Sequence, residues 1–195
     1  MKTVDHTHKA TAAGMRLLWM LRRTFSTWSP DLFTKLYATI IRPVLEYGVP
    51  AFFPCTKGEA KALEGVQRLG SRMVTSLRGF PYESRCKSLN LYTMAYRRYR
   101  ADLIHMFAII VLHQYPDLEH IFSQSVDPRT RGHPYKLAVQ RTDGLPHVYR
   151  LSRRAVPAWN ALPADVLHAP SVEQFKQRLD AHCASQTLFS PFSLL

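Results

Sequence analysis

The chain has 195 residues, 46% of them hydrophobic, and carries 26 Lys and Arg against 14 Asp and Glu, a formal net charge of +12. This apolar content supports a folded core and excludes a wholly disordered chain, while the basic excess indicates a polyanionic partner. The three cysteines form no C-x-x-C pair, which argues against a disulfide framework or a zinc site and favours reduced thiols.

The positive charge is concentrated in the first half of the chain. Residues 1–100 hold 17 basic and 6 acidic side chains, a balance of +11, whereas residues 101–195 hold 9 and 8, a balance of +1. A solvated basic surface can serve solubility alone. The asymmetry favours nucleic-acid binding instead, with the first half as the binding part.

Two amphipathic helices are predicted near the N-terminus. Apolar residues recur at intervals of three and four over residues 10–25, with basic side chains between them. Ser29, Pro30 and Asp31 combine an N-cap, a proline at the first helical position and a first-turn acid, which predicts a second helix. Pro43 lacks the backbone N–H that a helix interior needs, so we expect it to end or kink that helix.

Three more helices follow before the middle of the chain ends. Thr56 and Glu59 have capping-box spacing ahead of an apolar stripe that reaches Leu77, which predicts a helix of about five turns. A short helix is expected over residues 81–89, closed by Asn90 in a left-handed conformation. The longest helix is expected from about Thr93 to Gln114, where Pro116 follows.

The helical period disappears between Ser123 and Pro146. Residues 135–140 and 148–151 form a candidate β-hairpin, with Asp143 and Gly144 at its turn.

Helices return in the last third of the chain. Pro157 marks a helix start before Trp159, because proline is tolerated in a first turn. Ser171 and Gln174 make a second capping box, and order is expected to fade after His182.

These elements predict a mainly α fold in which one short β-hairpin is a further candidate element. The chain is divided into a flexible start, a helical region, an irregular linker that holds the candidate hairpin, a small C-terminal helical subdomain and a flexible tail. Their expected bounds are 1–9, 10–115, 116–150, 151–183 and 184–195.

No membrane association or secretion is predicted. The longest apolar stretch, Leu103 to Leu112, is about half of the ~20 residues that a membrane span needs. The polar start, Met1 to Ala13, lacks the apolar centre of a signal peptide. We therefore expect an intracellular protein, in the nucleus or the cytoplasm.

The acidic residues offer no evident catalytic centre. Metal-assisted phosphoryl or nucleotidyl transfer needs at least two converging carboxylates, and the acids here are scattered, mostly at helix starts or beside basic residues such as Glu64 before Arg68. A nuclease site built on Asp31, Glu59 and Lys61 is a weak alternative, because both acids open predicted helices rather than lying on neighbouring strands. No cofactor or metal site is predicted in this chain.

Basic side chains on helical faces are the candidate site. Any one of them is at least as well explained by a salt bridge or by solvation, so only their clustering indicates contacts along a phosphate backbone. The residues chosen are Arg22, Arg23, Arg42, Lys61, Arg68, Arg72, Arg97, Arg98 and Arg100.

A series of short motifs, in a fixed order, carries a family resemblance. It covers the chain from about Lys9 to His182 and includes Ser29-Pro30-Asp31, Leu36-Tyr37, Arg42-Pro43, Leu45-Glu46-Tyr47, Val66-Gln67-Arg68, Arg97-Arg98, Arg131-Gly132-His133, Ala158-Trp159-Asn160 and Phe175-Lys176. The series resembles the region that follows the polymerase palm in non-LTR, LINE-type (jockey-like) retrotransposon reverse transcriptases. Asn90 stands where that family usually has glycine, and Phe53 where it has tryptophan.

The resemblance implies that the helices before about residue 115 are thumb-like and grip the template–primer duplex. The palm's YxDD-type motif has no counterpart here, so we expect no catalysis by this chain alone, and Mg²⁺ only in the missing palm. The expected partners are RNA or an RNA–DNA duplex and the upstream palm. The alternatives are a non-catalytic protein-interaction or scaffold piece and a transposon relic without a selected function.

Overall fold

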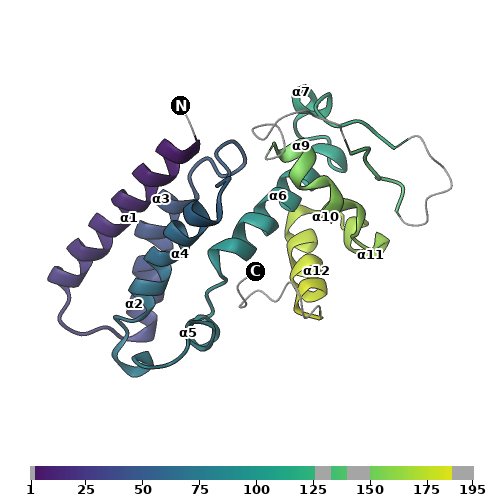
Figure 1. Cartoon of the computed structure of the whole chain (residues 1–195). Helices are drawn as coiled ribbons and strands as arrows, with labels where there is room; N and C mark the ends of the chain where they lie inside the picture. Colours follow the sequence, from purple (N-terminus) through teal and green to yellow (C-terminus); the bar gives the residue numbers. More distant parts are fainter. Residues whose placement is uncertain (1–2, 126–132, 140–149, 186–195) are drawn as a thin grey trace. The chain divides into compact units, whose positions relative to one another are not determined.

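The computed structural model describes residues 3–125, 133–139 and 150–185 (Figure 1). The prediction of a mainly α fold is confirmed, since helices make up most of these ranges and no strand occurs within them. An isolated antiparallel bridge joins Gln124 to Leu137. Most of the candidate hairpin, including its Asp143-Gly144 turn, lies outside the described residues, and Leu151 at its expected end is helical instead.

The chain forms two compact units that divide between Arg98 and Tyr99. This differs from the expected boundary at residue 115, because the later part of α6 (Met94–Ile110) packs with the C-terminal helices. The prediction that this helix is the longest and reaches Gln114 was wrong, since it ends at Ile110 after 17 residues and α1 (Thr3–Thr24) has 22. Phe107 of α6 stacks on Phe175 with ring centroids 4.2 Å apart, and Arg100 forms an ion pair with Asp180. The expected linker and C-terminal subdomain therefore share one unit with residues 99–115.

The first unit consists of helices of different lengths joined by turns and loops. They are α1 (Thr3–Thr24), α2 (Pro30–Leu36), the π-helical turn η1 (Tyr37–Ile41), α3 (Arg42–Glu46), α4 (Lys57–Ser71), the 3₁₀ turn η2 (Thr75–Leu77), α5 (Tyr82–Ser88) and the start of α6 (Met94–Ile110). Helix α1 packs against α3 and α4 (Figure 1). The approach is close at Gly14, where an added Cβ would lie 2.7 Å from Leu45 Cδ2.

Helix α1 begins at Thr3, not near Ala10 as predicted. Its buried stripe starts at Thr7, which is only 1% exposed, and continues through Ala10 and Gly14 at helical spacing. Asp5 adds a favourable charge in the first turn. The prediction of a flexible start was thus wrong for residues 3–9, because it counted only apolar residues and overlooked a buried threonine.

The second predicted helix is capped as expected, and of the two outcomes predicted at Pro43, an end or a kink, the end does not occur. The Ser29 hydroxyl accepts a hydrogen bond from Leu32 N at 3.2 Å. Pro43 lies at the start of α3, directly after the π-helical turn η1. Such a turn changes the hydrogen-bonding pattern ahead of the proline, so the helical run continues through it.

Helix α4 starts with the predicted cap, and its closing bond is displaced by one residue. Thr56 Oγ1 accepts from Glu59 N at 3.1 Å, while the Glu59 carboxylate accepts from Cys55 N at 2.7 Å. The helix ends at Ser71 rather than reaching Leu77. The Ser71 hydroxyl donates to the backbone carbonyl three residues earlier, a local bond that competes with helix continuation.

The closure of α5 agrees with the prediction. Asn90 has φ 49° and follows Leu89, the C-cap of the helix. Leu91 N donates to Cys86 O at 2.9 Å, and the Leu91 side chain is buried. This is a Schellman closure, with asparagine in the left-handed position that glycine usually occupies.

The second unit contains the rest of α6 and a set of short helices before one longer helix. These are α7 (Pro116–Glu119), α9 (Leu151–Arg154), α10 (Val156–Asn160), α11 (Ala164–Leu167) and α12 (Val172–Ser185). Pro157 lies in the first turn of α10, and Ser171 Oγ accepts from Gln174 N at 3.3 Å ahead of α12. Both predicted helix starts are confirmed.

The Trp159-Asn160 pair fastens residues 133–139 to α10. The Trp159 indole donates to Tyr135 O at 2.8 Å, and the Asn160 side chain accepts from Leu137 N at 3.0 Å and donates to Leu137 O at 2.8 Å. His133 Nε2 is 3.1 Å from Trp159 O and donates to it. Part of the motif series is therefore structural here, while Arg131 and Gly132 lie outside the described residues.

Candidate nucleic-acid interface

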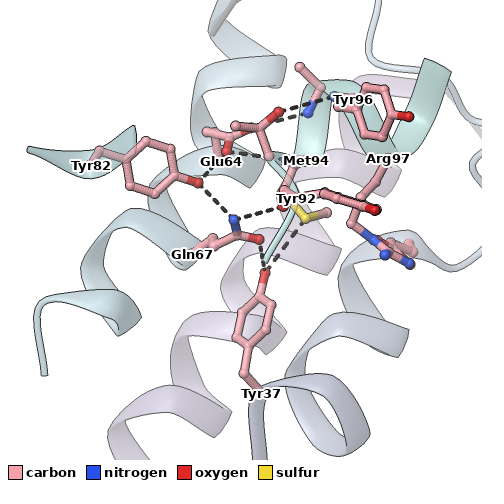
Figure 2. A network of polar contacts seen from close by, with 11 residues as sticks. Tyr37, Glu64, Gln67, Tyr82, Tyr92, Met94, Tyr96 and Arg97 are labelled. Atoms are coloured by element: carbon pink, nitrogen blue, oxygen red, sulfur yellow. Dashed lines mark hydrogen bonds and ion pairs between the residues drawn. The ribbon is translucent and has the colours of Figure 1, made fainter. Parts of the chain in front are cut away.

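A chain of buried polar side chains organises the first unit (Figure 2). The Tyr37 hydroxyl donates to Gln67 Oε1 at 2.8 Å, and Gln67 Nε2 donates to the Tyr82 hydroxyl oxygen at 2.9 Å and to Tyr92 O at 3.0 Å. The Tyr82 hydroxyl in turn donates to the Glu64 carboxylate. The bonds from Tyr37 to Gln67, from Gln67 to Tyr82 and from Tyr82 to Glu64 thus form one directed series that ends at a buried carboxylate.

Glu64 also caps the N-terminus of α6. Its two carboxylate oxygens accept from Met94 N and Ala95 N, each at 3.2 Å. The helix dipole and two otherwise unpaired N–H groups thus stabilise a carboxylate that is only 5% exposed. We had expected Glu64 to pair with Arg68 along α4, but the Arg68 guanidinium lies 4.6 Å from the centre of the Tyr82 ring instead.

The two tyrosines of this network are held in their neutral form. Burial raises the pKa of Tyr37, and the carboxylates of Glu46 and Glu64 raise it further. Burial is also the main cause of the raised pKa of Tyr82, followed by the charge of Glu64. The network therefore keeps its donors at neutral pH and connects η1, α4, α5 and α6 as a stable frame for the surface residues.

The nine predicted binding residues divide by exposure. Arg98 is buried, at 5% exposure, which does not suit the phosphate contact that the sequence predicts for it. Four of the nine are half-buried: Arg42, Arg68, Arg97 and Arg100. Exposed positions are those of Arg22, Arg23, Lys61 and Arg72.

Two of the half-buried arginines are engaged in ion pairs within their own unit. Arg97 pairs with Glu46, with Nη2 at 2.8 Å from Oε2. Arg100 makes a two-bond pair with Asp180 at 2.7 and 2.8 Å, and it belongs to the second unit. The sequence predicts both as phosphate contacts, because it does not reveal these distant partners.

Arg42 lies beside Arg97 and lines the same small hollow, of about 140 Å³. Burial and the neighbouring Arg97 charge lower the pKa of Arg42, whereas Glu46 opposes the shift. The pair faces Tyr37 and Gln67, so it borders the buried network.

An arginine hollow brings together three cations from separate elements. Arg22 comes from the last turn of α1, Arg72 is the C-cap of α4, and Arg78 is the C-cap of η2. They line a hollow of about 270 Å³ whose lining includes Trp28 and Ser26 and no acidic residue. Arg78 was not predicted, because it lies outside any helical stripe and its only sequence signal is its position before Gly79.

A lysine hollow lies between α4 and the start of α6. Lys57, Lys61, Arg68 and Arg98 line it, and its volume is about 400 Å³. Glu64 belongs to the same lining, so this hollow contains a negative charge as well. Lys57 was missed because its position at the first residue of α4 follows the predicted cap rather than the basic stripe.

The acids of the alternative nuclease site each serve a helix start. Asp31 is exposed in the first turn of α2, and Glu59 closes the α4 cap. Among residues 3–125, 133–139 and 150–185, no cluster of three or more His, Cys, Asp or Glu is placed to hold a metal ion.

The chain matches no family model, no curated protein and no solved structure in the comparisons made. Of the helices described, none is long and apolar enough to cross a membrane.

Proposed function

We propose that the chain binds template–primer nucleic acid, RNA or an RNA–DNA duplex, through the basic surface of its first unit. One observation carries the proposal: three arginines from three elements line a hollow whose lining has no carboxylate. Exposed cations that line one hollow without a carboxylate suit the negative charge of a phosphate backbone. The balance of +11 over residues 1–100 supports the same surface.

The exposed and the paired cations have different roles in this proposal. Arg22, Arg23, Lys61 and Arg72 are the phosphate contacts, since they are exposed. Arg97 and Arg100 maintain the structure through their carboxylate partners. Binding would therefore be dominated by sequence-independent electrostatics, with the buried frame fixing the positions of the cations.

The biological context that we propose is a C-terminal, thumb-like fragment of a non-LTR retrotransposon RNA-directed DNA polymerase. The ordered series of motifs is the support for it. The chain would then grip duplex without catalysis of its own, and Mg²⁺ would be held by a palm outside this chain. Its place of action would be the nucleus or the cytoplasm.

The affinity of the full chain for a labelled RNA–DNA hybrid tests this function. Fluorescence anisotropy between about 50 and 200 mM salt gives the salt slope, expected near −0.9 for each phosphate neutralised. A polyaspartate of equal charge is the control polyanion and is expected to bind more weakly. Absence of hybrid binding at low salt, or equal binding of polyaspartate, contradicts the proposal.

A second candidate function is a protein-interaction piece, and exposed apolar residues on α1 favour it. Trp19 is 42% exposed and Met20 is 50% exposed, side by side near the end of the helix. The upstream palm would be the partner of this face. The Arg22 guanidinium lies 5.0 Å from the centre of the Trp19 ring, so Met20→Ser is the variant that spares this contact. If Met20→Ser abolishes concentration-dependent self-association and leaves hybrid binding intact, the two functions use separate surfaces.

A further inference from the structure

We infer that the arginine hollow is a phosphate-binding site in which Arg22, Arg72 and Arg78 together hold a single phosphate group. The inference deepens the proposed function and rests on it for the source of the phosphate, which would be a strand of the bound nucleic acid. In this site three arginines contact the same phosphate. On an ordinary basic surface, each arginine would contact a different phosphate.

The position of the three arginines supports a shared ligand. Each lies at the end of a different element, so their side chains approach one hollow from separate directions. The volume of about 270 Å³ falls just below the range of about 300–1,000 Å³ that encloses whole small molecules. A single phosphate with its flanking sugar atoms fits this size class better than a complete cofactor.

The remaining polar side chains of the hollow match the same ligand. Ser26 and Thr75 both line it, are exposed, and carry hydroxyl groups that can donate to phosphate oxygens. With the three guanidinium groups, the hollow presents donors from five side chains and no carboxylate. Such a set is complementary to an anion with several acceptor oxygens.

Two of the side chains that line the hollow are apolar and buried. Trp28 is only 7% exposed and packs edge-on against Phe25 and Phe33, with ring centroids 5.9 and 6.1 Å away. Met73, which is 8% exposed, also lines the hollow. Buried apolar side chains beside a cation lower the local dielectric and strengthen its attraction to an anion.

The lysine hollow is the less favourable phosphate site, although it is larger. Its lining contains the Glu64 carboxylate, which repels an anion. Arg68 in that hollow already lies over the Tyr82 ring, and Arg98 is 5% exposed. Arg22 of the arginine hollow has a comparable ring contact, with its guanidinium 5.0 Å from the centre of the Trp19 ring. The difference between the two hollows is therefore the carboxylate, which only the lysine hollow has in its lining.

The first test uses inorganic phosphate and no nucleic acid. ¹H–¹⁵N spectra of the arginine Nε–Hε groups, assigned with single Arg→Lys variants, are recorded during a phosphate titration at constant ionic strength, with chloride as the reference anion. We expect saturable shifts at Arg22, Arg72 and Arg78 with phosphate and none with chloride. Absence of a saturable shift, or equal shifts with chloride, overturns the inference.

The second test counts phosphates through the salt slope of hybrid binding. The variant R22A/R72A/R78A is compared with R16A/K35A/K87A, which removes the same charge from exposed positions of the first unit outside all three hollows. We expect the hollow variant to flatten the slope by about one unit more than the control, because one phosphate contact is lost. A difference near zero or near three overturns the shared site.

The two tests separate the failure of this inference from the failure of the proposed function. A wild-type chain that shows no hybrid binding but a saturable phosphate shift contradicts the function and supports the site. Normal hybrid binding without a phosphate shift contradicts the site and leaves the function standing. Matching urea midpoints of the variants and the wild type show that folding is unchanged.

Discussion

The Tyr82 hydroxyl donates a hydrogen bond to the buried carboxylate of Glu64, which joins α5 to α4. The same carboxylate accepts from Met94 N and Ala95 N at the start of α6. Three helices thus meet at one negative charge. The positions of the surface cations depend on this junction, since Lys61 and Arg68 flank Glu64 on α4.

Removal of the Tyr82 hydroxyl tests this junction. Tyr82→Phe leaves the Glu64 carboxylate with one donor fewer, and a hydrogen bond to a charged group contributes about 1.5–3 kcal/mol. We expect the free energy of unfolding in urea to fall by that amount. The matched control is Tyr47→Phe, at a tyrosine that is 74% exposed, where a change below about 0.5 kcal/mol is expected. Equal effects of the two variants would contradict the junction.

Substitution of glycine by alanine should lower the stability of the chain at Gly14 and raise it at Gly65. In Gly14→Ala the new Cβ would meet Leu45 Cδ2 at 2.7 Å in a buried contact, and overpacking of this kind costs about 1–3 kcal/mol. In Gly65→Ala nothing lies within 4 Å, so the higher helix propensity of alanine should add about 0.5–1 kcal/mol of stability. Urea midpoints measure both, and a stabilising Gly14→Ala would show that α1 packs less closely.

Breaking the buried ion pair between Arg154 and Asp102 should strongly lower the stability of the second unit. Its side chains are 9% and 6% exposed, and Arg154 Nη2 lies 2.7 Å from Asp102 Oδ1. Asp102→Asn leaves a buried arginine without its counter-charge, so we expect a loss of about 3–5 kcal/mol. Glu119→Gln disrupts an exposed pair with His113 and should cost below about 1 kcal/mol. Loss of the Trp159 indole N–H signal in urea reports on this unit.

Because His133 is buried, the stability of the second unit should depend on pH. Burial lowers the pKa of His133 from its ordinary 6.5, so the unfolded chain takes up this proton first as pH falls. The free energy of unfolding should therefore be fully maintained above about 6.5 and should decrease as pH falls toward the folded pKa. His133 Nδ1 is buried and has no hydrogen-bond partner among the described residues, consistent with the neutral ring.

The variant His133→Gln isolates this contribution. Its amide can still donate to Trp159 O, and it does not titrate. We expect the variant to lose less stability than the wild type between about pH 7 and pH 5. Urea unfolding at each pH, monitored by the Trp159 indole signal, measures this loss. His8→Gln, at an exposed histidine of α1, should leave the loss unchanged. An identical pH profile for wild type and His133→Gln would refute the assignment.

Local signals in the sequence predicted much of the secondary structure. Ser29, Thr56, Ser171 and Asn90 act within a few residues of their partners, so their hydrogen bonds follow from spacing alone. The passage of the chain through Pro43 was not predictable, because the π-helical turn ahead of it has no sequence signature.

The candidate site was harder to predict, because a basic residue in the sequence does not show whether its side chain pairs with a carboxylate in the fold. Arg97 and Arg100 look like Arg22 and Arg23 in the sequence, but their partners, Glu46 and Asp180, are distant along the chain. Arg78 was overlooked since the hollow that it lines exists only after α1, α4 and η2 have packed.

The most direct test of nucleic-acid binding by the exposed cations compares two variants that remove equal charge. R23A/K61A removes exposed side chains, whereas R97Q/R100Q removes members of ion pairs. For each variant, the salt slope of hybrid binding and the urea midpoint are measured. We expect R23A/K61A to flatten the slope by about two units with an unchanged midpoint, and R97Q/R100Q to lower the midpoint with little change in slope. An unchanged slope in R23A/K61A, or equal flattening by both variants, would contradict binding through the exposed surface.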